Sequence, residues 1–284
     1  IDGYAGDITL GSGEQTLGML AHLDVVPAGD GWKHDPWGGE IEDGKLYGRG
    51  AIDDKGPALC ALYAMRAVKE AGIPLKDGVR LILGCDEETG MSDMRYYATK
   101  YKMPDYGFSP DAEFPAIYGE KGIMRFELSM PVAESGLESA EGGDAGNMVA
   151  AWARAIAAGV DYAVEGVSSH ASTPEKGTNA ISKLMEQLPG KFAEFYNKHI
   201  GFDVNGGLMG CGFEDEQSGK LTLNAGTLRT EDGLLRLVID IRCPVTFTLE
   251  QVQGAIEAAA APYGIGVENS AYTPSIYMDK NGKV

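Results

Sequence analysis

Four groups of acidic or imidazole side chains stand where apolar segments of the sequence end. They are His22-Leu23-Asp24, Asp53-Asp54, Asp86-Glu87-Glu88 and Asp111 with its neighbours. Carboxylate oxygens combined with one imidazole nitrogen are donors that Zn²⁺ and similar divalent ions accept. The carboxylates outnumber the needs of one ion, and a bridging aspartate can serve two. The residue types and their positions therefore predict a centre for two divalent cations.

Taken singly, these groups have simpler explanations. On a strand, His22 and Asp24 share one face, so the carboxylate could fix the imidazole tautomer, but a buried and fully hydrogen-bonded histidine fits equally well. Asp53 and Asp54 precede a helix and would also suit a solvated turn with an aspartate N-cap. Only the combination of the groups favours a metal centre.

The segments around these groups alternate between strand and helix patterns. We predict buried strands over 17–26 and 79–85, helices over 57–72 and 92–101, with Ser92 as a cap, and a long loop with short strands over 32–50. In open α/β sheets, ligands bind at the carboxyl ends of strands, where these acidic groups stand. The first part of the chain therefore predicts a parallel or mixed sheet covered by helices.

The sequence changes character after Gly122. We predict a strand over 123–130, a mobile acidic and glycine-rich segment over 131–146, a helix over 179–195, a strand over 234–242, a helix over 249–261 and a strand over 265–272. This order predicts a smaller α+β domain. We place it at 123–274, inserted into a metal-binding domain that covers 1–122 and resumes at 275–284.

The composition argues against two classes of partner. The 284 residues include 42 acidic and 24 basic side chains, a formal net charge of −18, so the basic face that nucleic-acid binding requires is not expected. No run approaches the roughly 20 apolar residues that a membrane-spanning helix needs. The four cysteines form no C-x-x-C pair, and we expect buried, reduced thiols in a cytoplasmic protein.

Several motifs together resemble the dinuclear zinc exopeptidase family, which includes aminoacylases, carboxypeptidases, desuccinylases and carnosinases. The motifs are HLDVVPAGDGW, YGRGAIDDKGP, DEETG and SPDAEFPAIYGEKG. The pattern is most similar to that of bacterial PepV-like dipeptidases. The resemblance covers nearly the whole chain. It implies a zinc-exopeptidase-like mixed α/β sheet flanked by helices, here truncated, with an inserted α+β lid domain of ferredoxin-like type.

The resemblance also implies roles in the metal centre. Asp24 would orient the His22 ring, and Glu87 would be the general base. The implied ligands are His22 and Asp111 for one ion, Glu88 for the other, and Asp53 as the bridge between them.

Three residues of the second domain match lid positions of the family. His170, in the segment SHASTP, would contact the substrate carbonyl, although the residues alone also suit a helix entry in a loop. Asn147 and Arg242 would bind substrate, with Arg242 holding the peptide carboxylate through two parallel hydrogen bonds. His34 and His199 match no family position, and we expect both on the surface.

The family's last metal ligand is a histidine after the lid, and this sequence has no histidine after His199. We therefore expect a fragment whose last ligand lies beyond Val284.

The leading prediction is hydrolysis of the peptide bond in dipeptides or short peptides. A water bridging two zinc ions would attack, Glu87 would take its proton, and His170 would help to hold the oxyanion. Mn²⁺ or Co²⁺ could replace Zn²⁺, and the protein would act as a monomer or as a homodimer through the lid. Two alternatives stay open: a deacylase of N-acyl amino acids or acylated diamines, and a non-catalytic metal-binding homologue.

Overall fold

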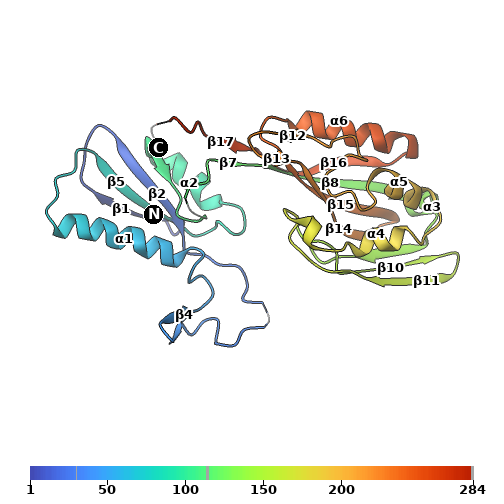
Figure 1. Ribbon diagram of the computed structural model, residues 1–284, viewed down its shortest axis with the longest axis horizontal. Helices are drawn as coiled ribbons and strands as arrows, with labels where there is room; N and C mark the ends of the chain where they lie inside the picture. The colour runs from blue at the N-terminus through green and yellow to red at the C-terminus, as the bar shows by residue number, and fades with distance from the viewer. Residues whose placement is uncertain (30, 113–114, 283–284) are drawn as a thin grey trace. The chain divides into compact units, whose positions relative to one another are not determined.

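The computed structural model describes residues 1–29, 31–112 and 115–282. It contains two compact units, one formed by Ile1–Ile117 with the residues from Lys280 on, the other by Tyr118–Asp279 (Figure 1). Asp30, Glu113 and Phe114 of the motifs, and residues 283–284 of the predicted return to the first domain, lie outside the described residues. Each unit has its own sheet and its own hydrophobic core.

The first unit is built on a mixed four-stranded sheet. In spatial order its strands are β1 (Gly6–Leu10), β5 (Gly78–Gly84), β2 (Thr16–His22) and β6 (Tyr106–Phe108). β2 runs parallel to β5 and β6, whereas β1 runs antiparallel to β5. The mixed α/β arrangement agrees with the prediction. The sequence pattern does not predict β1, because its segment GDITL carries only two large apolar side chains.

Two helices cover opposite faces of this sheet. α1 (Lys55–Glu70) packs against Leu81, whereas α2 (Ser92–Lys100) packs through Tyr97 against Ile82. Neighbouring strand residues point to opposite faces, so burial on both sides explains the continuous apolar run of β5. The predicted loop between β2 and α1 contains a short hairpin of β3 (Glu40–Glu42) and β4 (Lys45–Tyr47).

Two element ends differ from the prediction beside the candidate site. β2 ends at His22, earlier than predicted, because its neighbour β5 ends at Gly84, whose carbonyl accepts the N–H of Leu23. Ser92 does not cap α2 but begins it. Met91 takes the N-cap position in the left-handed conformation, with φ 56°.

The second unit is built on a seven-stranded antiparallel sheet. In spatial order its strands are β11 (Val160–Glu165), β10 (Trp152–Ala157), β9 (Ser139–Gly142), β14 (Thr222–Glu231), β15 (Leu234–Cys243), β8 (Gly122–Pro131) and β16 (Gly266–Thr273). Shorter elements are β7 (Gly119–Glu120) paired with β17 (Ile276–Tyr277), β12 (Glu214–Asp215) paired with β13 (Gly219–Lys220), and the 3₁₀ turns Pro174–Lys176 and Ala261–Tyr263. The sequence pattern does not predict β10, β11 or β14.

Helices cover one face of this larger sheet: α4 (Ala180–Met185), α5 (Lys191–His199) and α6 (Leu249–Ala260) (Figure 1). Alternate residues of β8, from Met124 to Met130, are buried in the core that includes these helices. The residues between them, such as Arg125, are only half-buried and point to the other face. The strand period therefore separates an apolar core face from a polar face.

Two predictions for the second unit are wrong. The segment 131–146 is ordered as α3 (Val132–Ser135) and β9, because β9 pairs with β10 and buries Ala140. The single helix predicted over 179–195 is two helices. The chain turns between α4 and α5 at Gly190, which has φ 106°, a left-handed value that glycine adopts readily.

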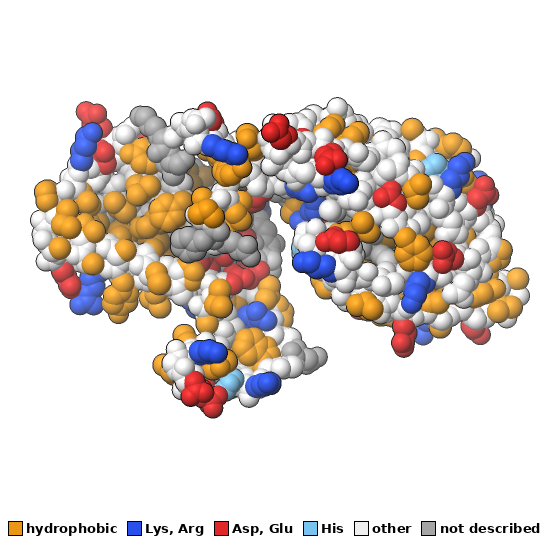
Figure 2. Space-filling view, in the orientation of Figure 1, with side chains coloured by type: hydrophobic (Ala, Val, Ile, Leu, Met, Phe, Trp, Pro, Cys, Tyr) orange, Lys and Arg blue, Asp and Glu red, His pale blue; other side chains and the backbone are white. Residues whose placement is uncertain are grey.

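The surface of the first unit is partly apolar. Figure 2 shows hydrophobic side chains gathered on its visible face, and α1 exposes Leu59 and Tyr63. Among the described residues, every helix is too short or too polar to cross a membrane.

Candidate active site

Three of the predicted ligands meet at the carboxyl end of β2. Nε2 of His22 lies 2.8 Å from Oδ1 of Asp53 and 3.5 Å from Oδ2 of Asp111. The buried His22 ends β2, Asp53 precedes α1, and Asp111 follows β6, which pairs with β2. Donor atoms of the three residues all lie within 4.8 Å of one another, a spacing that suits a shared cation.

The acidic turn after β5 forms a second donor group around the same imidazole. Donor atoms of His22, Glu87 and Glu88 also lie within 4.8 Å of one another. In the parallel pair of β2 and β5, Gly84 is opposite His22, so the turn that follows lies beside the ring. Among the described residues, Asp53 and Glu88 occur in different groups, and both groups share His22 rather than Asp53.

Asp24 connects the imidazole to the acidic turn. Its carboxylate accepts hydrogen bonds from the backbone N–H groups of Glu87, at 3.2 Å, and Glu88, at 3.0 Å. Nδ1 of His22 lies 3.0 Å from the backbone oxygen of Asp24 and 3.3 Å from its carboxylate. The resemblance implies only that Asp24 orients the His22 ring. In the structure Asp24 contacts both the ring, which belongs to both donor groups, and the backbone of Glu87 and Glu88.

Asp54 is a buried acid to which the family resemblance gives no role in the metal centre. Its side chain is fully buried, and Oδ2 accepts the backbone N–H of His22 at 3.2 Å. Oδ1 has no hydrogen-bond partner among the described residues. Burial raises the pKa of Asp54 and outweighs the hydrogen bond from His22. The doubled aspartate was the only signal in the sequence, and a solvated turn explains it equally well.

The charges around His22 favour a cation. Burial raises the pKa of Asp111, and the charge of Asp53 raises it further. Burial also raises the pKa of Glu87, with added repulsion from Asp111 and Glu88. For His22, burial lowers the pKa, but the Asp53 hydrogen bond and the nearby carboxylates raise it above its ordinary value. The crowded carboxylates and one imidazole therefore fit divalent ions such as Zn²⁺.

Asp86 belongs to the same acidic turn but has a different place. Its carboxylate accepts the N–H of Ser92 at 2.9 Å, and the hydroxyls of Ser92 and Thr89 also donate to it. These bonds lower the pKa of Asp86 to about 2. Asp86 therefore connects the acidic turn to the start of α2 through hydrogen bonds.

The three predicted residues of the second unit occur close together within that unit. His170 forms an isolated antiparallel bridge with the residue after Asn147, and the Asn147 carbonyl accepts the N–H of Ala171 at 2.9 Å. Arg242 pairs with Thr222 across β15 and β14, and the Thr222 hydroxyl donates to the Ala171 carbonyl at 3.4 Å. A chain of direct contacts therefore connects the three.

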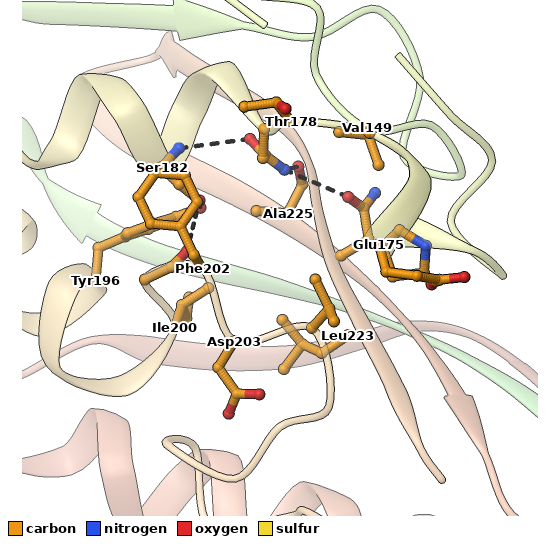
Figure 3. Close-up of a pocket in the computed structure, with 16 residues that line it drawn as sticks. Val149, Glu175, Thr178, Ser182, Tyr196, Ile200, Phe202, Asp203, Leu223 and Ala225 are labelled. Carbon is orange, nitrogen blue, oxygen red and sulfur yellow. Dashed lines mark hydrogen bonds between the residues drawn. The ribbon is translucent and has the colours of Figure 1, made fainter. Parts of the chain in front are cut away.

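The loop after His170 also lines a cavity of about 280 Å³ (Figure 3). Val149, Leu223 and Ala225 provide apolar wall, and the hydroxyls of Ser182 and Tyr196 lie 2.9 Å apart. Asn147, His170 and Arg242 are not among the residues that line the cavity. It therefore does not contain the residues with a predicted role.

The remaining histidines lie outside both donor groups. His34 and His199 are both half-buried and so partly exposed to solvent: His34 stacks on Tyr47 with ring centroids 3.9 Å apart, and His199 packs beside Phe195. The predicted burial of the cysteines is wrong for two of the four. All four are free, but Cys60 and Cys85 are exposed, and only Cys211 and Cys243 are buried.

Sequence comparison relates the chain to one peptidase family. The pattern of peptidase family M20/M25/M40 matches residues 18–268. The Bacillus subtilis (strain 168) protein named "Putative dipeptidase YtjP" is 38% identical over 304 residues, covering 92% of this chain and 66% of that protein. "Putative dipeptidase SH1171" of Staphylococcus haemolyticus (strain JCSC1435) is 31% identical and covers 99% of this chain and 70% of that protein.

Solved structures share the fold. An M20 family metallo-carboxypeptidase, Sso-CP2 from Sulfolobus solfataricus, matches 98% of this chain and 68% of that chain, with TM-score 0.56 and 17% identity. Human carnosine dipeptidase 1 matches 97% and 65%, with TM-score 0.52 and 18% identity. The chain thus spans about two thirds of the length of these relatives. From the match over residues 18–268 and the identity to these relatives, the chain belongs to peptidase family M20/M25/M40.

Proposed function

We propose that this protein hydrolyses the peptide bond of dipeptides or short peptides with two divalent ions. The observation that carries the proposal is the meeting of His22 with Asp53, Asp111, Glu87 and Glu88 in two overlapping donor groups. The names of the relatives support the dipeptide as substrate. The proposed ions are Zn²⁺, with Mn²⁺ or Co²⁺ as replacements, and the proposed ligands are His22, Asp53, Glu88 and Asp111.

The proposed chemistry assigns proton transfer to Glu87. Bound divalent ions would polarise the substrate carbonyl and lower the pKa of the attacking water. The Glu87 carboxylate would accept a proton from that water and donate it to the leaving amine. Its pKa, raised by burial, suits a group that both accepts and donates a proton. The two backbone hydrogen bonds to Asp24 would keep Glu87 in position.

We propose that the first unit is the metal-binding domain and the second a lid of ferredoxin-like type, with His170 on the substrate carbonyl and Asn147 and Arg242 also binding substrate. The sheet order β14-β15-β8-β16 supports the lid type, and so does the chain order β8, α4 with α5, β14, β15, α6, β16. Strands β9 to β11 are inserted after β8. The protein would act as a monomer or as a homodimer through this lid. The four free cysteines support the proposal of a cytoplasmic location.

The test compares the metal-loaded chain with its Glu87→Gln variant on unblocked dipeptides and on N-acyl amino acids. We expect the rate of dipeptide hydrolysis to fall about 100-fold or more in the variant. Metal affinity, measured by calorimetry, should be unchanged. Glu134→Gln, a change of an exposed glutamate in the second unit, is the matched control. Turnover of N-acyl amino acids alone would identify a deacylase instead, and metal binding without any turnover would identify a non-catalytic homologue.

A further inference from the structure

The polar face of the second sheet contains a buried carboxylate held between two arginines. Asp240 of β15 is fully buried. Its Oδ2 accepts a hydrogen bond from Nε of Arg125, in β8, and its Oδ1 accepts one from Nε of Arg242, each at 2.9 Å. Of these three residues, only Arg242 has a role in the proposed function.

The strand register explains why the three side chains meet. Asp240 and Arg125 are direct partners in the antiparallel pair of β15 and β8. Arg242 lies two residues further along β15, on the same face. A buried carboxylate requires compensating charge, and here two guanidinium groups surround one carboxylate. The trio therefore has a net positive charge of one.

Both arginines use Nε for Asp240, and among the described residues the structure shows no protein acceptor for their terminal Nη atoms. The side chain of Arg125 is 38% exposed and that of Arg242 is 14% exposed. Asp240 therefore fixes two guanidinium groups while their outer nitrogens stay available. Such a pair suits an incoming carboxylate, which accepts charge-assisted hydrogen bonds on both of its oxygens.

The neighbouring contacts place this trio beside the other proposed substrate residues of the same unit. A Cβ atom on Gly146 would lie 3.9 Å from Nε of Arg125, so the loop that carries Asn147 passes close to Arg125. On the same sheet face, Glu127 is already paired with Arg236. This acid therefore neutralises Arg236 rather than the trio.

We propose that Arg125 is a second specificity-determining residue, which holds the substrate's free terminal carboxylate together with Arg242, and that Asp240 is a positioning residue for both. The inference rests on the proposed function for Arg242. The group that Arg125 and Arg242 would recognise together is the free α-carboxylate, which a C-terminal amide lacks.

The test measures binding rather than turnover, so it is independent of the proposed reaction. Calorimetry of the full metal-loaded chain carrying Glu87→Gln would compare the dipeptide Ala-Ala with its C-terminal amide. We expect tighter binding of the acid, and a loss of about 10- to 100-fold in acid affinity on adding Arg125→Gln, with amide affinity unchanged. Arg236→Gln, a change of a paired arginine on the same face, should leave both affinities unchanged.

Asp240→Asn tests the positioning role. It should weaken acid binding in the parent but add little once Arg125 and Arg242 are both glutamine, whereas a purely structural role would also weaken amide binding. Equal binding of acid and amide by the parent, or unchanged acid binding with Arg125→Gln, would overturn the inference. If the Glu87→Gln chain discriminates between acid and amide but the chain with Glu87 intact does not hydrolyse dipeptides, the proposed function is refuted and this inference stands.

Discussion

Nε2 of His22 lies 2.8 Å from Oδ1 of Asp53, although the two residues are 31 positions apart in the sequence. The contact joins the end of a strand to the residue pair before α1. It makes the imidazole a common member of two groups of carboxylates, and this arrangement carries the proposed metal chemistry.

Removal of the Asp53 charge should weaken metal binding strongly. In Asp53→Asn the side chain keeps its size but loses the charge beside His22. We expect a loss of Zn²⁺ affinity greater than the roughly 10- to 100-fold that is typical of outer-shell partners. Calorimetric titration of the metal-free chain measures this, with Glu70→Gln, a change in an exposed ion pair, as control. Unchanged affinity would remove Asp53 from the ligand set.

Asp24 should affect metal binding without being a ligand. In Asp24→Asn the side chain can no longer accept hydrogen bonds on two carboxylate oxygens from the N–H groups of Glu87 and Glu88. We expect a reduction in Zn²⁺ affinity of about 10- to 100-fold, with the number of bound ions unchanged. A loss of one bound ion would contradict this outcome, because it would make Asp24 a direct ligand.

Tyr97 should make the folded chain sensitive to alkaline pH. Burial and the hydrogen bond that its hydroxyl donates to Asp7, at 2.5 Å, raise the pKa of Tyr97 to about 12. In the unfolded chain the phenol titrates near its ordinary value of 10. The stabilisation is therefore complete below pH 10 and is lost as the pH rises from about 10 through about 12.

The matching variant is Tyr97→Phe. We expect it to be less stable by about 1–3 kcal/mol at neutral pH, but to lose less stability than the parent between pH 10 and 12, as measured by urea unfolding at each pH. Tyr63→Phe changes an exposed tyrosine and should follow the parent curve. Parallel curves for Tyr97→Phe and the parent would contradict the assigned titration.

Asn179 should be important for the stability of the second unit. Its Oδ1 accepts the N–H of Ile181 at 2.9 Å at the start of α4, and its Nδ2 donates to the Ala225 carbonyl at 2.7 Å in β14. We expect Asn179→Ala to lower the free energy of unfolding by about 2 kcal/mol, from one lost cap and one lost hydrogen bond. Asn179→Ser keeps a capping oxygen, places no acceptor against the Ala225 carbonyl, and should cost about half as much. Equal losses in the two variants would show that the cap contributes nothing.

The sequence by itself was sufficient to identify the family and to predict the helices α1 and α6. It also predicted the strands with long apolar or alternating patterns, such as β5 and β8. These features depend on local periodicity and on short motifs such as HLD and DEETG. The same information named His22, Glu87 and Glu88 as members of one centre, because His22 lies in one recognisable strand and the two glutamates follow another.

The remaining features depend on contacts between distant segments. The pairing of β9 with β10 orders a segment whose composition favours mobility, and β14 becomes buried only through its neighbours. In the sequence, Asp54 also suits a solvated turn and Asp240 looks like an ordinary surface acid. In the folded chain both are fully buried, and Asp54 accepts the N–H of His22 while Asp240 pairs with Arg125 across the sheet. Burial and charge pairing are properties of the folded neighbourhood, so only the tertiary structure could decide them.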